Sequence, residues 1–511
     1  MKSSLMSCDS KTSEAAGVKK VEPALVRGRV AAVTPSSEKP LRLLAEQALS
    51  RVAGAPLIGG NSLELLIDAE AHFEAWLKAI RGAQQRVLME NYIFCDDDIG
   101  RLFRDTLTER ASAGVTILVV ADWLGCLGQS RRSFWEPLRA AGGQVRVFNP
   151  PRIGEPFGWI RRDHRKLLVV DGTYGSLSGV CVSAKWLGRP ERSIPPWRDT
   201  GVELRGPAVA ELEDAFLQSW KAAGPAIASF SRTSGQPVGS VALRVIATQP
   251  ASGSVYRLDQ QVAAMARSTL WLSDAYFVGV TPYVQALVAA AQDGVDVRLL
   301  VPGTSDIPAV ARMSRSGYRP LLRAGIRVFE WNGSMLHAKT AVADGQWARV
   351  GSSNLNVSSW LGNFEVDIAV ENAGFAGLLA AQYEVDLQNA TEIVLAPRRF
   401  RRGEQIQSDN PRPPRTARGG GSSGRAAAGA LRIANTVRAA LGNRRVLGEA
   451  AGVPWLTTAI VFALLAVVAV LWPAAIGWPF AAFAAWLALN LGIRGWRQRA
   501  RNRREGKRDE Q

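Results

Sequence analysis

The feature that most constrains this chain is a short pattern that occurs twice: a histidine, a lysine two residues later and an aspartate seven residues after the histidine. The first copy is His164-Arg-Lys-Leu-Leu-Val-Val-Asp171 and the second is His337-Ala-Lys-Thr-Ala-Val-Ala-Asp344. Two of the chain's three histidines open this pattern, so coincidence is a poor explanation. Each copy lies in an apolar run that predicts a strand, where residues two apart share one face. The histidine and lysine of each copy are therefore expected to face one ligand.

The segments around the two motifs repeat one order of elements. Residues 41–80 have amphipathic helical spacing that includes Leu63, Leu66 and Ile67. Beyond them, strands are predicted at 86–94, 115–121, 145–148, 164–171 and 176–181, and helices at 99–112, 132–141 and 208–220. The second series has strands at 243–247, 270–275, 295–301, 326–329 and 337–344, and helices at 255–267, 282–292, 308–323 and 373–389. This alternation predicts βαβ units and a largely parallel sheet.

The recurrence predicts an internal duplication of one α/β unit. Local similarity supports it, because Ala113-Gly-Val-Thr-Ile-Leu-Val-Val corresponds to Asp293-Gly-Val-Asp-Val-Arg-Leu-Leu. We expect a first repeat over 41–222 and a second over 241–400, joined by a linker at 223–240 that is rich in Gly, Ser and Pro. Two such α/β/α sandwich repeats, packed about a pseudo-twofold axis, would form one site from their two His-Lys pairs.

The net charge of +17 is confined to the ends of the chain. Lys, Arg, Asp and Glu give +3 over 1–40, +10 over 398–445, −1 over 446–493 and +5 over 494–511, whereas 41–397 sums to zero. A neutral motif-bearing body argues against a nucleic-acid groove. Basic segments that flank an apolar stretch favour anionic lipid as the partner.

The C-terminal part of the chain is predicted to enter a membrane. Residues 455–493 contain no charged residue, Pro473 divides them, and each half at about 1.5 Å per residue comes close to the ~30 Å hydrocarbon core. Because arginines flank both ends, we expect a helical hairpin with both ends in the cytoplasm; a re-entrant hairpin is the alternative. The remaining segments are expected as a disordered arm (1–40), a flexible basic linker (401–429), a basic juxtamembrane segment (430–453), the transmembrane hairpin (454–493) and a basic cytoplasmic tail (494–511).

The motif residues suit chemistry on a phosphodiester. Lys166 and Lys339 would neutralise the non-bridging oxygens, one imidazole would attack phosphorus, and the other would act as general acid and base. Each imidazole needs a carboxylate to fix its tautomer, and Asp199 and Glu365 are the candidates. With three histidines and four cysteines at unpatterned spacing, no metal, cofactor or disulfide framework is expected.

Over roughly 58–402 the chain resembles the phospholipase D superfamily and, within it, the bacterial cardiolipin synthases. The resemblance rests on the two His-x-Lys-x4-Asp motifs, Glu90-Asn-Tyr-Ile-Phe, Trp197-Arg-Asp-Thr and Gly351-Ser-Ser-Asn-Leu-Asn. It implies a phosphohistidine intermediate that is resolved by an alcohol or by water. By correspondence, His164 is the nucleophile and His337 the general acid and base. The motif set also includes Lys166, Asp171, Lys339 and Asp344, of which the two aspartates are expected to be structural rather than chemical. Asp199 and Glu365 would orient the histidines, and Ser352 and Asn354 would bind phosphate.

Two departures from the family pattern stand out. The position 17 residues after His164 is Cys181, whereas Asn354 stands at the same distance from His337. A thiol is a weaker donor than an amide, so the first half-site is expected to bind phosphate less tightly, which leaves the choice of nucleophile open. In addition, the apolar segment lies at the C-terminal end, whereas synthases of this family usually carry theirs at the N-terminal end.

The sequence thus favours a phosphatidyltransferase at the inner membrane, with its catalytic part in the cytoplasm. Its substrate would be phosphatidylglycerol, with phosphatidylethanolamine as the alternative donor. No nucleic-acid partner is expected, and the sequence leaves the oligomeric state open. A phospholipase D hydrolase that releases phosphatidic acid is the alternative, followed by a nuclease of the superfamily and a non-catalytic lipid scaffold. Choosing transfer over hydrolysis rests on the resemblance alone.

Overall fold

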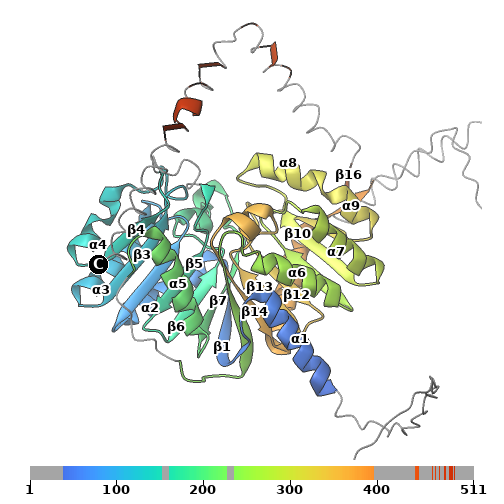
Figure 1. Cartoon of the computed structure of the whole chain (residues 1–511), viewed down its shortest axis with the longest axis horizontal. Coiled ribbons are helices and arrows are strands. Elements are labelled where there is room, and N and C mark those ends of the chain that lie inside the picture. Colours follow the sequence, from blue (N-terminus) through green and yellow to red (C-terminus); the bar gives the residue numbers. More distant parts are fainter. Residues whose placement is uncertain are drawn as a thin grey trace, which may run out of the picture. The chain divides into compact units, whose positions relative to one another are not determined.

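The computed structural model describes residues 38–151, 160–226, 235–395 and 444–447, together with scattered residues between 463 and 489. The strands of these described residues form one sheet of sixteen, in the order β16-β15-β11-β10-β9-β12-β13-β14-β8-β1-β7-β6-β5-β2-β3-β4 (Figure 1). The order divides at the β1–β8 pair into two halves, each of which carries one of the motifs.

The first half contains the elements up to residue 223. Its strands are β1 (Ile58–Ile67), β2 (Arg86–Asn91), β3 (Thr116–Asp122), β4 (Gln144–Phe148), β5 (Lys166–Val170), β6 (Tyr174–Ser178) and β7 (Thr200–Arg205). Its helices are α2 (Asp68–Gly82), α3 (Asp98–Ser112), η1 (Arg132–Trp135), α4 (Glu136–Ala140), η3 (Ala184–Leu187), η4 (Pro190–Arg192) and α5 (Val209–Ala223). Helix α1 (Glu38–Ala53) precedes them in sequence, but its Leu49 and Ala53 pack in the core of the second half.

The second half contains the elements from residue 241 onward. Its strands are β8 (Val241–Thr248), β9 (Thr269–Ser273), β10 (Asp296–Pro302), β11 (Arg327–Trp331), β12 (Thr340–Ala343), β13 (Trp347–Gly351), β14 (Glu365–Glu371), β15 (Ala390–Leu395) and β16 (Arg444–Leu447). Its helices are α6 (Ser254–Met265), α7 (Thr281–Gln292), α8 (Pro308–Ser316), α9 (Tyr318–Arg323), η5 (Ser358–Gly362) and α10 (Ala373–Gln388).

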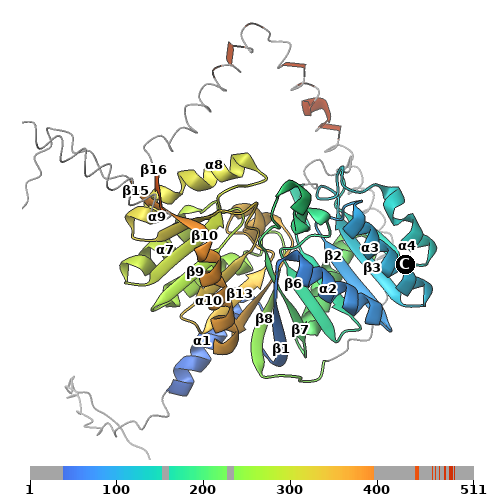
Figure 2. The same cartoon turned by 180° about the vertical axis from the view of Figure 1, so that it is seen from behind.

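The two halves have corresponding strand orders when each is read from the edge of the sheet to its centre. Strands run β4-β3-β2-β5-β6-β7-β1 toward the centre and then β8-β14-β13-β12-β9-β10-β11 away from it, and β1 pairs with β8 in antiparallel fashion. Helices α5, α6 and α7 lie in front of the sheet in Figure 1, whereas α2 and α10 lie in front in the reverse view of Figure 2. One hydrophobic core draws residues from both halves, including Phe216 of α5 and Phe375 of α10. Because this core is shared, the halves form one continuous body.

The sheet is mixed, so the prediction of a largely parallel sheet is wrong. Parallel neighbours occur within β2-β3-β4 and β9-β10-β11, where a helix crosses between strands, and between β15 and β16. The strand that follows each motif histidine is instead joined to the next strand by a tight turn, β5 to β6 and β12 to β13, and this turn reverses the chain direction. Asp171 and Asp344 occupy these turns with φ of 53° each, and each is followed by a glycine of positive φ.

A second correction concerns Leu63, Leu66 and Ile67, whose spacing predicted a helix. They lie in β1, which pairs with β7 on one side and β8 on the other. Four-residue spacing over so short a run fits either structure, and pairing on both edges decides for the strand. The other predicted strands and helices of the two halves are confirmed to within a few residues.

Most of the predicted terminal segments lie outside the described residues. This holds for 1–37 of the predicted arm, 227–234 of the first linker, the linker 401–429, the tail 494–511 and most of the predicted hairpin 454–493. Within the predicted juxtamembrane segment, residues 444–447 form β16. Among the described residues, no helix has both the length and the apolar character needed to cross a bilayer.

Candidate active site

His164 lies in an extended segment that enters β5. Its backbone N–H donates to the Phe364 carbonyl at 2.9 Å, which ties the segment to the residue before β14 of the other half. The ring Nδ1 is 3.0 Å from Oε2 of Glu365, the first residue of β14. The predicted pairing of a motif histidine with Glu365 is therefore present in the structure, and it joins the two halves.

His337 is held in the corresponding way before β12. Its N–H donates to the Arg198 carbonyl at 2.7 Å, and its Nδ1 is 2.8 Å from Oδ2 of Asp199, the residue before β7. Each motif histidine thus contacts a carboxylate that the opposite half supplies. Because both Nδ1 atoms are occupied in this way, both Nε2 atoms remain available to a ligand.

The two carboxylates are supported by different groups. Ser352 Oγ donates to Glu365 Oε2 at 2.6 Å, whereas Trp186 Nε1 donates to Asp199 Oδ2 at 3.2 Å. The position that matches Ser352 in the first half is Gly179, where an added Cβ would lie 2.3 Å from Asp199 Oδ1. The carboxylate packs directly against this glycine, so a serine cannot take the same place, and the indole of η3 supplies the second donor instead.

The charges around these carboxylates keep them ionised. Burial raises the pKa of Asp199, but the nearby His337 imidazole and Lys339 ammonium outweigh burial and hold that pKa below its usual range. For Glu365, His164 and Lys166 likewise outweigh burial, so its pKa is also lowered. Both side chains are therefore expected to be acceptors for a histidine N–H at neutral pH.

The motif lysines reach back toward the histidines. Lys166 Nζ donates to the His164 carbonyl at 2.5 Å, and Lys339 Nζ donates to the His337 carbonyl and lies 3.1 Å from His337 Nδ1. Both lysines are buried. Burial, reinforced by the charge of Lys166, lowers the pKa of Lys339 to about 8 against the pull of Asp199. Two mutually repelling cations in one pocket favour an anionic ligand.

Without a bound anion, both histidines are expected to be neutral at pH 7. Burial and the charge of Lys339 lower the pKa of His337 to about 4, although Asp199 raises it. Burial also lowers the pKa of His164, against the effect of Glu365. A neutral imidazole can attack phosphorus. The negative charge of a bound phosphodiester would in turn offset the lysines and raise the pKa of the second histidine.

Asp171 and Asp344, which the sequence grouped with the catalytic residues, do not line the pocket. They sit in the turns at the far ends of β5 and β12. Asp171 accepts three backbone N–H groups of residues 84–86 at 2.8 Å each, and Asp344 accepts those of residues 267–269 at 2.7–2.9 Å. Each aspartate thereby anchors the start of the adjacent strand, β2 or β9, and this geometry gives it a structural task.

The predicted phosphate contacts differ in their geometry. Asn354 lines the pocket, and its buried Oδ1 has no hydrogen-bond partner among the described residues. Ser352 is fully buried, and its hydroxyl is engaged by Glu365, so the structure does not bring it to the phosphate position. Cys181 lines the pocket, and burial raises the pKa of its thiol to about 11. The first half-site therefore presents a neutral thiol where the second presents an amide.

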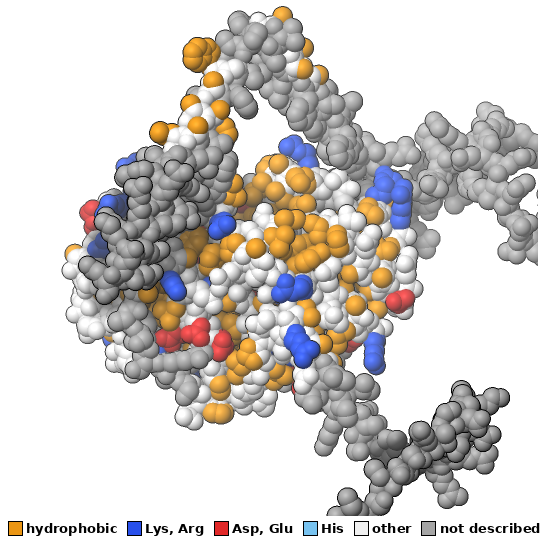
Figure 3. All heavy atoms as spheres, viewed as in Figure 1, with side chains coloured by type: hydrophobic (Ala, Val, Ile, Leu, Met, Phe, Trp, Pro, Cys, Tyr) orange, Lys and Arg blue, Asp and Glu red, His pale blue; other side chains and the backbone are white. Residues whose placement is uncertain are grey.

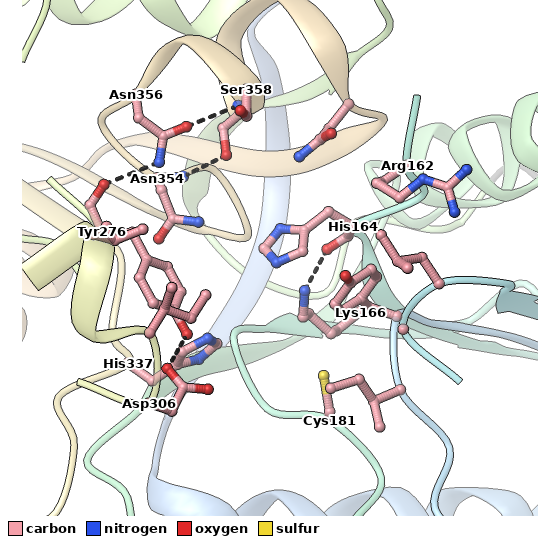
Figure 4. A pocket seen from close by; sticks show the side chains of 18 of the residues that line it. Arg162, His164, Lys166, Cys181, Tyr276, Asp306, His337, Asn354, Asn356 and Ser358 are labelled. Carbon is pink, nitrogen blue, oxygen red and sulfur yellow. Dashed lines mark hydrogen bonds between the residues drawn. The ribbon is translucent and has the colours of Figure 1, made fainter. Parts of the chain in front are cut away.

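The pocket between the halves has a volume of about 810 Å³. Figure 4 shows His164 and Lys166 on one side of it and His337, Tyr276 and Asn354 on the other. Aromatic rings surround His337, since the centroids of Trp186, Trp197 and Tyr276 lie 5.5, 5.6 and 5.8 Å from its ring. Among the described residues, one aromatic ring lies this close to His164, that of Tyr92, with its centroid 5.0 Å from the imidazole centroid.

Several pocket residues were not predicted from the sequence. They include Tyr92, Arg162, Trp186, Tyr276 and Asp306. Tyr92 directly follows β2, where side chains at the carboxyl end of a strand tend to face a site, and this was the available signal. Trp186 lies in the short helix η3, and the others lie in loops, whose path the sequence pattern does not specify. Among the described residues, no three His, Cys, Asp or Glu side chains are grouped as metal ligands would be.

Comparison with known proteins gives a consistent picture. Residues 261–388 match the model of the family described as cardiolipin synthase, PLD-like domain. Cardiolipin synthase A of Pseudomonas aeruginosa is 35% identical over 366 residues, covering 70% of this chain and 74% of that protein. Cardiolipin synthase 1 of Bacillus cereus is 28% identical over 372 residues, covering 70% and 72%. The crystal structure of phosphatidylserine synthase from Haemophilus influenzae Rd KW20 has a TM-score of 0.50 at 14% identity, covering 68% of this chain and 91% of that one, and this likeness concerns the fold.

Proposed function

Because the chain belongs to the cardiolipin synthases with phospholipase D-like domains, we propose that it is a phosphatidyltransferase that makes cardiolipin. It joins two phosphatidylglycerols and releases glycerol, or takes the phosphatidyl group from phosphatidylethanolamine. The observation that carries the proposal is the pair of crossed His–carboxylate contacts that face one pocket with two buried lysines. This arrangement supports a two-step transfer with one histidine for each role.

In the first step, the donor phosphate lies between Lys166 and Lys339. Nε2 of neutral His164 attacks phosphorus, so a P–N bond forms as the P–O bond to the headgroup glycerol breaks. His337, protonated once the anionic phosphate is bound, gives its Nε2 proton to the departing oxygen. Glu365 and Asp199 keep each ring in the required tautomer by accepting from Nδ1.

In the second step, a phosphatidylglycerol hydroxyl replaces the released glycerol. His337, now neutral, accepts the hydroxyl proton while the oxygen attacks phosphorus and the P–N bond to His164 breaks. The products are cardiolipin and an unchanged site. Asn354 supports phosphate binding through its side-chain amide, whereas Cys181 offers a weaker donor on the other side of the pocket.

The roles of the two histidines follow the motif correspondence and gain support from their surroundings. The His164 side chain is 12% exposed and that of His337 is 5% exposed. The more accessible ring suits the nucleophile, which must reach the phosphorus of an incoming lipid. The more enclosed ring, among three aromatic side chains, suits proton transfer away from water.

The proposal includes the arrangement at the membrane. Residues 41–222 and 241–400 form the two repeats of the catalytic part, and 454–493 form a transmembrane hairpin that holds it at the cytoplasmic face of the inner membrane. The uncharged stretch 455–493 and its flanking arginines support this placement. Phospholipid is the partner, and the neutral charge of 41–397 argues against nucleic acid.

Turnover by the purified full chain in phosphatidylglycerol vesicles tests the function. We expect cardiolipin and glycerol in equal amounts by mass spectrometry. Phosphatidic acid as the sole lipid product would replace transfer by hydrolysis, and DNA cleavage without lipid turnover would remove the lipid function.

Variants separate the roles of the histidines. His164→Ala and His337→Ala should each abolish turnover, whereas Lys221→Ala, an exposed lysine of α5, should not change it. During turnover by the unmodified chain, rapid denaturation should trap acid-labile phosphate on His164, because the intermediate forms on the nucleophile. Label on His337 instead would reverse the assignment.

A further inference from the structure

Exposed hydrophobic side chains cluster at the mouth of the pocket. Six large hydrophobic residues line it and yet are 37–57% exposed: Leu124, Leu127, Ile160, Ile307, Met313 and Val357. We call this set the apolar rim. Figure 3 shows hydrophobic side chains gathered on the surface around the position that α8 has in Figure 1, with Lys and Arg side chains among them.

The apolar rim is assembled from separate segments of both halves. Leu124 and Leu127 follow β3, and Ile160 leads into the His164 segment. Ile307 directly precedes α8, Met313 lies within it, and Val357 precedes η5. Soluble surfaces expose single apolar residues at random, but several that converge on one opening mark an interaction site. Burying such side chains also favours binding, so they indicate a surface that is covered when the enzyme works.

The charges around the apolar rim are predominantly basic. Among the described charged residues that line the pocket, Arg162, Lys166 and Lys185 are cations and Asp306 is an acid. Lys185 is paired with Asp306 at 3.3 Å, and Arg162 is paired with the buried Asp122 at 3.2 Å. Exposed Arg161 adjoins Ile160, and exposed Arg312 adjoins Met313. Apolar side chains with Lys and Arg beside them are the pattern by which proteins enter the headgroup layer of anionic bilayers.

We propose that the apolar rim docks on the surface of an anionic phospholipid bilayer, so that headgroups enter the pocket while the acyl chains stay in the hydrocarbon. This inference rests on the proposed function, because a lipid substrate is what makes the pocket mouth continuous with the bilayer. A docked mouth also lets the acceptor lipid enter directly after the leaving group departs. The apolar rim is distinct from the predicted hairpin, which would tether the chain without orienting the pocket.

The docking is tested by comparing turnover of phosphatidylglycerol in vesicles with turnover of soluble short-chain phosphatidylglycerol. Leu127→Gln/Met313→Gln in the full chain removes two exposed apolar side chains, and Leu378→Gln/Val385→Gln on α10, 61% and 54% exposed, is the matched control outside the pocket. With long-chain phosphatidylglycerol vesicles, turnover by the rim variant should fall about 10- to 100-fold. With soluble short-chain phosphatidylglycerol below its micellar concentration, the rim variant should match the unmodified chain. Equal losses on both substrates, or no loss on either, would overturn the proposal.

Methionine oxidation gives a readout that does not need activity. Met313 in the apolar rim is 52% exposed and Met265, at the end of α6, is 40% exposed, so an undocked chain should oxidise Met313 at least as fast. In phosphatidylglycerol vesicles, the inactive His164→Ala/His337→Ala chain should oxidise Met313 more slowly than Met265. Phosphatidylcholine vesicles should largely remove this protection. Equal protection of Met313 in both lipids, or no protection, would contradict docking on an anionic bilayer, even if the unmodified chain makes cardiolipin. Protection of Met313 without cardiolipin synthesis by the unmodified chain would contradict the proposed function and leave the docking standing.

Discussion

Replacing Trp186 by phenylalanine isolates the hydrogen bond that distinguishes the first half-site from the second. The indole Nε1 donates at 3.2 Å to Asp199 Oδ2, the same oxygen that contacts His337 Nδ1 at 2.8 Å. Trp186 itself is 2% exposed and packs edge-on against His337. The variant removes one of the donors that hold the Asp199 carboxylate, whose Oδ1 still accepts the Thr200 N–H at 2.8 Å, so His337 is oriented less firmly. Trp186 acts as a positioning residue, since it works through Asp199.

The expected size follows from the charge of the acceptor. A hydrogen bond to an ionised group contributes about 1.5–3 kcal/mol. Each 1.4 kcal/mol corresponds to about a tenfold change in rate, so kcat should fall about 10- to 150-fold. The KM for phosphatidylglycerol should change little, because the lysines and Asn354 that face the phosphate are untouched.

Trp197→Phe is the matched control for the loss of ring volume. Trp197 lies 5.6 Å from the His337 ring, about as close as Trp186, but it makes no described hydrogen bond to Asp199. Cardiolipin formation in vesicles should be followed for both variants over a range of substrate, with their unfolding midpoints measured in parallel. A KM rise without a kcat loss, or equal kcat losses in both variants, would refute the reasoning.

Three further variants test other features. His72 is buried in α2, and burial lowers its pKa from 6.5 to about 4, so only the unfolded chain binds a proton in between. Neutral His72 therefore costs no stability above pH 6.5, but the folded state loses stability as the pH falls from 6.5 toward 4. His72→Leu should remove this loss, which is about 3 kcal/mol of unfolding free energy, as measured by urea unfolding at several pH values. The same pH dependence in both chains would contradict this. Asp344→Ala should lower the unfolding free energy by about 2–4 kcal/mol, because three hydrogen bonds from backbone N–H groups are lost. The kcat of the folded enzyme should not change, and a fall in kcat would show a chemical role for Asp344. Cys181→Asn should lower the KM for phosphatidylglycerol about 3- to 10-fold by adding an amide donor, and an unchanged KM would remove position 181 from phosphate binding.

Sequence reasoning succeeded where one local property decides the outcome. Hydrophobic periodicity located most strands and helices, because burial on one or both faces imposes the spacing. It failed for Leu63 to Ile67, where pairing with β7 and β8 decides, and for strand direction after each motif, where tight turns at Asp171 and Asp344 reverse the chain. Both outcomes depend on neighbours that are distant in sequence.

The candidate site shows the same division. Both motif histidines and Lys166 line one pocket, and Lys339 lies directly beside His337, in line with the alternation predicted for a strand. The partner of each histidine could not be assigned, because the contacts join residues 201 and 138 positions apart. Correspondence with the family predicts Ser352 as a phosphate contact, but spacing gives only the position of a residue. The direction of the Ser352 hydroxyl, which points to Glu365, depends on the folded structure.

Gly179 has a consequence for how the two half-sites came to differ. In a symmetric dimer encoded by one gene, every substitution occurs in both half-sites at once; a single chain can change one and keep the other. With Asp199 lying against Gly179, a side chain at 179 and the present carboxylate position exclude each other. A serine at 179, with Asp199 and Trp186 unchanged, would therefore push the Asp199 carboxylate away from its contact with His337. The half-sites have thus lost their interchangeability, and exchanging one for a copy of the other would require several simultaneous mutations.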